Sequence, residues 1–452
     1  IRRTSRSATV ITRRAGLQTD VISALPGPET RTDLEKRDDK LSWLLGCRQQ
    51  YGDCFRVRAE SRQADTIVVN HPDWVKRVLV SNHRNYTKGI GIERVRVLLG
   101  NGLMTSEGEQ WRRQRRMLQP AFHKPRIEFF LGIYLQLAQA LADRWQQQAW
   151  QRQPVNISAS VSDTTLQAIL RAVFSDDLDW LVRETGHNPF ELISRDSDRD
   201  LQFAVKFRAL AKPVQQLIDR RVREQRFPPD LLSHCMLARD KSSGEPMSAR
   251  LLSDEVLTLI VAGHETTAAS LSWVWYLLAR YHGVLKKVGR EARGCAAKQL
   301  VERAQLQSLV WIPRVIKEAL RLYPPGWLYT RRAIAEDRCG DYRIAAGSDV
   351  FICSWLLHRH PRYWDEPECF RPERFAPQQE AGRNRYAYIP FSAGPRHCIG
   401  ETFAMTEMMI HLAVLAARFR ITSSVPDDIG IETDVNLRPA SDLFLQLETY
   451  TA

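Results

Sequence analysis

Apolar residues recur at three- and four-residue spacings through much of the first two thirds of the chain, with charged residues at the intervening positions. This spacing is typical of amphipathic helices, and it predicts helices within 111–153 and 164–226. A third, longer helix is predicted from Ser253 to about Tyr281, because Ser253 and the two acidic residues after it favour a helix start. The first two thirds of the chain are therefore expected to be mostly helical.

Short alternating or β-branched runs interrupt this pattern near both ends of the chain and indicate strands. They occupy 54–58, 66–70, 342–344, 349–353 and 443–447. Further helices are predicted over 71–79 and from about Cys398 to Arg418. Because helices and strands do not alternate regularly, doubly wound and barrel folds fit poorly. We expect a mainly α protein with a minor β part, formed by a single domain over residues 41–452.

The basic charge of the chain changes this picture little. The 452 residues include 65 Lys plus Arg against 52 Asp plus Glu, a net charge of +13, but no nucleic-acid recognition motif accompanies them. We therefore expect no nucleic-acid binding, and an acidic protein surface as partner. The first nineteen residues hold five arginines, no acid and no apolar signal core. Residues 1–40 are expected to form a flexible basic arm, with a targeting remnant or a membrane-surface patch as alternatives.

Neither the apolar segments nor the cysteines indicate a membrane or secreted protein. The segment from Val256 to Ala279 is interrupted by His264 and Glu265, so no transmembrane helix is predicted. The eight cysteines contain no CxxC pair and no metal-ligand spacing, which argues against a zinc site and a disulfide framework. A reducing, cytoplasmic compartment is the expectation.

One cysteine, Cys398, has unusual neighbours. It lies in the segment FSAGPRHCIG, residues 391–400, directly before the last predicted helix. Gly394 permits a tight turn, and a helix N-terminus stabilises a thiolate. In the same segment, Phe391 can shield the sulfur from water, and the guanidinium of Arg396 can bind a carboxylate through two hydrogen bonds. Gly400 leaves room for a flat group close to the backbone. Together these features suit haem iron ligated by cysteine.

The pattern F-x-x-G-x-R-x-C-x-G resembles the haem-binding loop of cytochrome P-450 monooxygenases. The resemblance implies the cytochrome P-450 fold, with haem b between the long central helix and the cysteine loop. It makes Cys398 the iron ligand. It also makes four other residues of the loop part of the cofactor site, namely Phe391, Gly394, Arg396 and Gly400.

The run AGHETT at 262–267 lies midway along the long predicted helix. Small residues at 262 and 263 would let a planar group lie against one face, and Thr266 can hydrogen-bond back to the Ala262 carbonyl and open the helix locally. The run resembles the oxygen-activation motif of the family, in which Thr266 and Glu265 are catalytic and handle protons. A glutamate buried for packing is the alternative. An HExxH zinc site is excluded, because Ala268 stands where the second histidine is required.

A buried ionic network is implied by two further motifs. Glu318 and Arg321 are three residues apart on a predicted helix and can pair, which taken alone is an ordinary salt bridge. Downstream, Arg374 lies in the run PERF at 372–375. By resemblance, Arg374 completes a Glu-Arg-Arg network that holds the fold together rather than catalysing the reaction.

Several basic residues match positions that bind haem propionates in the family. Trp111 and Arg115 lie four apart on one predicted helical face, where a solvated basic helix is the alternative. The resemblance makes both of them propionate partners, together with Arg396. It assigns Arg332 to the same role, although the neighbouring Arg331 leaves that assignment open by one residue.

Family position also suggests which residues contact a substrate. Residues 87–104 are expected to form a mobile roof over the site. The expected pocket residues are mostly apolar, which implies a lipophilic substrate such as a terpenoid, polyketide, fatty acid or other secondary metabolite. They are Met104, Val261, Ala262, Trp327, Leu328, Tyr329, Leu443 and Phe444.

The resemblance implies a monooxygenase, most simply a hydroxylase, and the run WLYTRR at 327–332 looks like that of soluble bacterial members. The chain ends about fifty residues after Cys398, so no fused reductase is expected. Electrons from NAD(P)H are expected through a separate reductase and an acidic ferredoxin or flavodoxin, docked at Arg112, Arg113 and Arg116. The alternatives are a peroxide-driven or isomerising member of the family and a non-enzymatic haem sensor or carrier. The pair of Glu265 and Thr266 argues against both.

Overall fold

The computed structural model describes residues 25–62, 64–195, 201–295, 300 and 302–450. Residues 1–24 of the predicted basic arm lie outside this range. The rest of the predicted arm is not free of the domain, because the N–H of Thr32 donates to Arg58 and Leu34 is buried in the core. The arm boundary predicted at residue 40 is therefore wrong, since the apolar side chain of Leu34 is stabilised by packing against the core.

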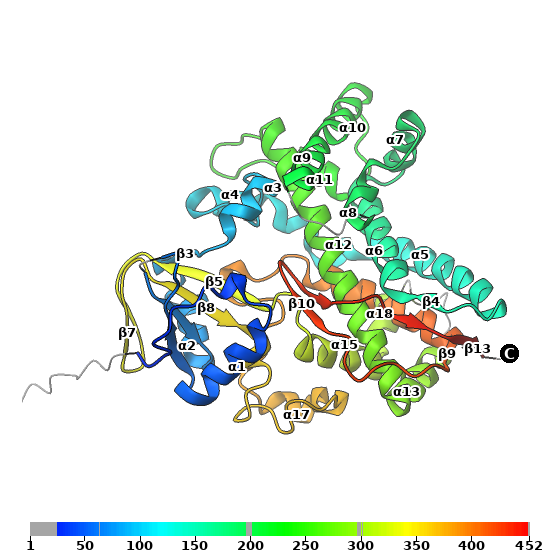
Figure 1. The fold of residues 1–452 in the computed structure, drawn as a ribbon. Helices are drawn as coiled ribbons and strands as arrows, with labels where there is room; N and C mark the ends of the chain where they lie inside the picture. Colours follow the sequence, from blue (N-terminus) through cyan, green and yellow to red (C-terminus); the bar gives the residue numbers. More distant parts are fainter. Residues whose placement is uncertain (1–24, 63, 196–200, 296–299, 301, 451–452) are drawn as a thin grey trace, which may run out of the picture.

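Helices make up most of the described chain (Figure 1). They are α1 (Lys40–Tyr51), α2 (Pro72–Lys76), α3 (Ile92–Leu99), α4 (Gly108–Leu118), α5 (Lys124–Trp150), α6 (Ile157–Phe174), α7 (Asp177–Thr185), α8 (Leu192–Arg195), α9 (Leu201–Ala209), α10 (Ala211–Glu224), α11 (Leu231–Leu237), α12 (Ala249–Arg280), α13 (His282–Gly294), α14 (Arg303–Ser308), α15 (Trp311–Leu322), α16 (Ser354–Leu357), α17 (Pro377–Ala381) and α18 (Glu401–Arg418). Within the part of the chain that the structure describes, no helix is long and apolar enough to cross a membrane.

The long helices follow the predicted pattern, with corrected ends. The predicted helix 111–153 is two helices, α4 and α5, separated at Pro120, which lacks an N–H for the helical ladder. The central helix α12 begins at Ala249 rather than Ser253, because the hydroxyl of Ser248 accepts the N–H of Leu251 and caps it.

The strands form one larger sheet and four small pairs. The larger sheet has the order β1 (Cys54–Val57), β2 (Thr66–Val69), β8 (Asp349–Cys353), β5 (Leu328–Ala333) and β3 (Tyr86–Lys88). Neighbouring strands in this sheet are antiparallel, except that β2 and β8 are parallel. The pairs are β10 (Ile431–Thr433) with β11 (Leu437–Pro439), β12 (Phe444–Leu445) with β4 (Val155–Asn156), β13 (Leu447–Thr449) with β9 (Phe419–Ile421), and β6 (Asp337–Cys339) with β7 (Tyr342–Ile344). In Figure 1 the larger sheet lies to one side of the helical body.

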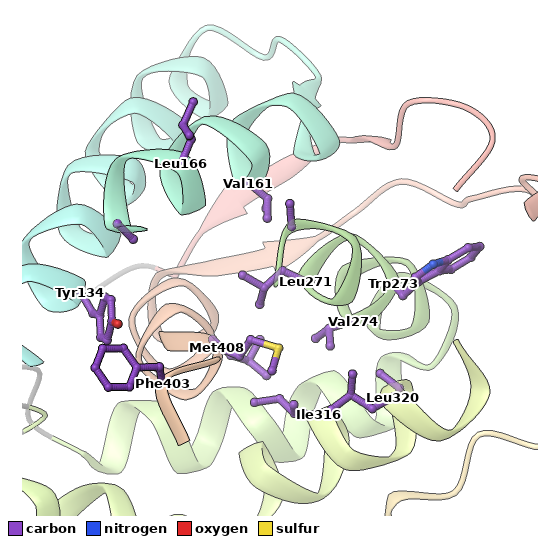
Figure 2. Packing of buried hydrophobic residues seen from close by; sticks show 14 of the residues in the cluster. Tyr134, Val161, Leu166, Leu271, Trp273, Val274, Ile316, Leu320, Phe403 and Met408 are labelled. Carbon is purple, nitrogen blue, oxygen red and sulfur yellow. The ribbon is translucent and has the colours of Figure 1, made fainter. Parts of the chain in front are cut away.

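The main core surrounds α12. Figure 2 shows Leu271 and Val274 of this helix among side chains from the neighbouring helices, with Val161 of α6, Ile316 of α15 and Met408 of α18. All five side chains are at most 1% exposed. Burying each contributes about 1.5–3 kcal/mol, so this packing fixes α12 relative to the helices on either side.

Candidate active site

The middle of α12 departs from the burial of the rest of the helix. Residues 252–260 and 267–279 are buried, but Val261, Ala262, Glu265 and Thr266 are partly exposed. The prediction that Gly263 leaves space for a planar group on this face of the helix is wrong. A Cβ at Gly263 would lie 2.8 Å from the Cδ1 atom of Ile169, so this glycine permits close packing against α6. The small residue that remains for a cofactor or ligand face is Ala262.

Two polar side chains of this segment have defined partners. The hydroxyl of Thr266 donates to the carbonyl of Ala262 at 2.8 Å, as the sequence predicted, although α12 stays helical through this turn. The carboxylate of Glu265 accepts a hydrogen bond from the side-chain amide of Asn436 at 3.0 Å. Asn436 lies in the turn between β10 and β11, and sequence reasoning missed it because 171 residues separate the two.

The cysteine loop is built on two backbone constraints. Gly394 has φ +72°, and a Cβ there would clash with the carbonyl of Leu79, so only glycine fits. The N–H of Cys398 donates to the carbonyl of Phe391 at 2.9 Å and closes the loop. The phenolic oxygen of Tyr329 accepts a hydrogen bond from the N–H of Ser392 at 3.0 Å. These contacts fix the position of the Cys398 side chain just before α18.

The environment of the Cys398 sulfur differs from that of the other thiols. Burial raises the pKa of this thiol, while the N–H groups of Gly400 and Glu401 and the nearby Arg115 lower it. Cys398 is nevertheless an exposed residue. A Cβ at Gly400 would lie 3.9 Å from this sulfur, at ordinary van der Waals contact, so Gly400 borders the ligand position. Six of the other seven cysteines are buried, and the last, Cys369, is exposed.

Basic side chains gather beside the cysteine loop. Arg115 of α4 donates to the carbonyl of His397 at 3.0 Å. The guanidinium of Arg396 lies 4.3 Å from the ring centroid of Trp111 and pairs with Glu107 at 2.6 Å. The structure therefore brings Trp111, Arg115 and Arg396 together, as the motifs predicted from positions almost 300 residues apart.

The arginine of β5 that faces this cluster is Arg331, the neighbour that the sequence left open, whereas Arg332 points away from it. Successive residues of a strand point to opposite faces. Arg332 lies on the outer face, where its half-exposed side chain pairs with Asp349 at 3.0 Å. Arg331 is 8% exposed, and its burial together with the nearby Arg396 lowers its pKa to about 10.

Lys88 is a further basic residue of the cluster that sequence reasoning missed. It lies on β3 directly opposite Arg331 of β5. Burial, together with the nearby Arg331 and Arg396, lowers the pKa of Lys88 to about 7, while Glu107 opposes the shift. A single lysine in a short strand carries no recognisable pattern, so only the pairing of β3 with β5 could have identified it.

The predicted roof of the site contains β3 and α3 and then meets α12. The N–H of Asn101 donates to the carboxylate of Asp254 at 2.9 Å, and the N–H of Leu103 donates to Glu255 at 2.8 Å. These bonds hold the end of the roof segment against the helix. Met104 follows directly and is partly buried, which is compatible with its predicted place in the pocket. The mobility of the roof stays a prediction.

Four predicted pocket residues need correction. Trp327 is 5% exposed and packs in the core, with its ring N–H 3.4 Å from the carbonyl of Asp434. The Tyr329 hydroxyl is bound under the cysteine loop. Leu443 is buried, and Phe444 is exposed on β12. Phe444 and Leu445 form β12, which pairs with β4, whereas the hairpin of β10 and β11 contacts α12 through β11. Val261, Ala262 and Leu328 are partly exposed, as a pocket wall requires.

Comparison with known proteins decides the family. A family model described as cytochrome P-450 matches residues 33–186 and 188–442. The chain belongs to the cytochrome P-450 family. It is 34% identical over 394 residues to cyclooctatin synthase of Streptomyces melanosporofaciens, covering 82% of this chain and 83% of that protein. It is 31% identical over 388 residues to cyclooctat-9-en-7-ol 5-monooxygenase of the same organism, covering 82% and 83%.

Solved structures agree with the fold. The crystal structure of the cytochrome P450DA heme domain superposes with a TM-score of 0.82 over 95% of this chain and 98% of that one, at 24% identity. The predicted mainly helical cytochrome P-450 fold with small β sheets is therefore confirmed. This cytochrome P-450 is a monooxygenase, and haem is the cofactor of its family.

The residues around Cys398 fit haem b. Cys398 offers a thiolate ligand for the iron. Lys88, Arg331 and Arg396 lie within electrostatic reach of the Glu107 carboxylate, and Arg115 lies near Cys398. A group with two carboxylates balances this excess of positive charge, and arginine forks suit carboxylates. Haem b carries two propionates, so these four side chains are the residues that would hold them.

Substitution of the two neighbouring arginines separates their roles. We expect Arg331→Gln to weaken haem retention by about 10- to 100-fold, because a charge-assisted hydrogen bond contributes about 1.5–3 kcal/mol. Arg332→Gln removes only an exposed partner of Asp349, which keeps Arg62 at 3.2 Å, so haem retention should not change. The rate of haem transfer to excess apomyoglobin measures both. Equal rates in the two variants would contradict the assignment.

The fold-holding network of the family is present around Glu318. Its carboxylate accepts from Arg321 at 2.7 Å and from Arg374 at 2.9 Å, and all three side chains are buried. Arg321 also donates to the carbonyl of His358 at 2.9 Å. The ring Nε2 of His358 accepts the N–H of Ile389 at 2.8 Å, so the network is linked directly to the start of the cysteine loop.

Proposed function

We propose that this cytochrome P-450 hydroxylates a lipophilic small molecule, a terpenoid hydrocarbon or alcohol in particular. The observation that carries the proposal is the Glu265 and Thr266 pair on α12, beside the partly exposed apolar residues Val261 and Ala262. The relative named cyclooctat-9-en-7-ol 5-monooxygenase supports the substrate class. In balanced form, a C–H bond, O₂, two electrons and two protons give C–OH and water.

The chemistry divides between the cofactor and two side chains of α12. Haem supplies the iron at which dioxygen is reduced, and a cysteine thiolate ligand favours O–O cleavage. Thr266 holds its hydroxyl at the partly exposed turn, where it could exchange its bond to Ala262 for one to a water molecule and so hold a proton there. Glu265, one residue earlier, passes protons between solvent and this turn.

We expect Thr266→Ala to lower the yield of product per electron pair several-fold and to raise hydrogen peroxide by a matching amount. The variant keeps the apolar wall of the pocket, so substrate affinity should stay within about twofold because the buried apolar area changes little. Product, peroxide and NAD(P)H consumption are measured together. Thr267→Ala serves as the control, since Thr267 is buried on the same turn. Unchanged coupling in Thr266→Ala would contradict the proton-handling role.

The electrons are proposed to come from NAD(P)H through a separate reductase and an acidic ferredoxin or flavodoxin. Two of the three arginines predicted for docking support this. Arg112 and Arg116 are about half exposed on α4 and share one partner, Glu109, so a positive excess remains. Arg113 instead pairs with buried Asp240 at 3.3 Å, so its charge is already balanced. Docking through this surface should weaken as salt rises.

An absorption spectrum of the reduced protein under carbon monoxide, followed by titration with lipophilic compounds, tests the function. A thiolate-type carbonyl band, a ferric spectral change on binding a terpenoid, and product formation with ferredoxin and reductase are expected. Turnover with peroxide alone would favour the peroxide-driven alternative. Haem and ligand binding without turnover would favour a sensor or carrier.

A further inference from the structure

The carboxylate of Glu265 is held by a residue from the other end of the chain. The side-chain amide of Asn436 donates to its Oε2 atom at 3.0 Å. Asn436 belongs to the turn that joins β10 to β11, and Figure 1 shows this hairpin beside the middle of α12. The contact therefore joins the acid of the oxygen-activation motif to the C-terminal hairpin.

The turn that carries Asn436 is fixed on both sides. The N–H of Leu437 donates to the carbonyl of Pro325 at 3.0 Å. The ring N–H of Trp327 lies 3.4 Å from the carbonyl of Asp434. Thr433 and Leu437 are paired in the hairpin register. These contacts set the backbone before and after Asn436, so its amide reaches α12 from a defined position.

The hairpin also places a positive charge near the same carboxylate. Arg438 pairs with Glu432 at 2.8 Å. Glu432 is the main cause of the raised pKa of Arg438, and Glu265 contributes to it as well, so the two lie within electrostatic reach. The hairpin thus holds an amide donor and a positive charge close to the Glu265 carboxylate.

We propose that Asn436 is a positioning residue for proton delivery, whose amide holds the Glu265 carboxylate in one orientation beside Thr266. The inference rests on the proposed proton role of Glu265. A glutamate side chain rotates about three bonds, and a hydrogen bond to a fixed donor removes most of these conformers. Without the amide, the carboxylate spends less time where it can pass a proton to the Thr266 turn.

Replacement of Asn436 by alanine tests the proposal in the haem-loaded enzyme with its electron donors. We expect product per electron pair to fall several-fold and hydrogen peroxide to rise, with substrate affinity within about twofold since little apolar area changes. The solvent deuterium isotope effect on product formation should increase, because proton delivery becomes limiting. Asn436→Leu keeps the volume of the side chain and should behave in the same way. Asp434→Asn removes a charge from the same turn and should leave all three quantities unchanged.

A double-mutant cycle separates this inference from the proposed function. Glu265→Gln should lower coupling, and in that background Asn436→Ala should add no further loss. If Glu265→Gln leaves coupling unchanged, the proton role fails and the inference fails with it. If Glu265→Gln lowers coupling but both Asn436 variants match the parent enzyme, the inference alone is overturned.

Hydrogen exchange gives a measurement that does not depend on turnover. Glu265→Ala removes the acceptor, so amide exchange over residues 431–439 should become faster in the haem-loaded protein. Exchange identical to that of the parent protein would show that the contact does not hold the hairpin to α12, and would overturn the proposal. Equal isotope effects in Asn436→Ala and the parent would do so as well.

Discussion

We expect Cys398→Ser to abolish the thiolate-type carbonyl band of the reduced protein and to reduce oxygenation to background. A serine hydroxyl keeps the size of the side chain but is a far weaker ligand and electron donor than a thiolate. The loop should persist, because its constraints are the positive φ of Gly394 and the hydrogen bond from the N–H of residue 398 to Phe391. The Cys398→Ser variant should therefore still fold, so the loss of oxygenation can be distinguished from unfolding and from loss of haem.

Cys369→Ser is the matched control. Cys369 is the other exposed cysteine among the eight, whereas the remaining six are buried. In one of these six, Cys353, burial raises the pKa of the thiol to about 12. The control should keep the carbonyl band and full turnover. A thiolate-type band in Cys398→Ser, or its loss in Cys369→Ser, would move the ligand assignment to another cysteine.

Features that depend on residues close in sequence could be predicted. The turn at Gly394, the placement of Cys398 before a helix and the bond from Thr266 to Ala262 are all local, so spacing alone identifies them. The Glu318 and Arg321 pair is also local, since residues three apart share a helical face. The resemblance to the family then added Arg374, which no spacing rule connects to them.

Features set by strand pairing or by the course of the tail could not be predicted. The choice between Arg331 and Arg332 depends on which face of β5 turns inward, and that follows from its pairing with β3 and β8. Phe444 alternates like a strand residue, but sequence does not show that β12 pairs with β4. Lys88 reaches the site through the pairing of β3 with β5, and Asn436 through the packing of its hairpin on α12, so neither has a pattern of its own.

The largest expected effect on stability comes from Glu318→Gln. The change removes the anion that pairs with Arg321 and Arg374 and leaves two buried guanidinium groups without a counter-charge. Loss of one partner from a buried ion pair costs about 3–5 kcal/mol. This is a large fraction of the roughly 5–15 kcal/mol by which folded domains are stable. Denaturant unfolding of the haem-loaded protein measures the change in the free energy of unfolding.

The same substitution should lower haem content, because the network is linked to the cysteine loop. Arg321 binds the carbonyl of His358, and His358 in turn accepts the N–H of Ile389, so a displaced guanidinium shifts the segment that leads to Cys398. Lys317→Gln is the control on the same helix. It breaks a half-exposed pair with Glu380 at 2.9 Å, which contributes at most about 1 kcal/mol. Equal losses of stability and haem in the two variants would mean that the buried network does not hold the loop.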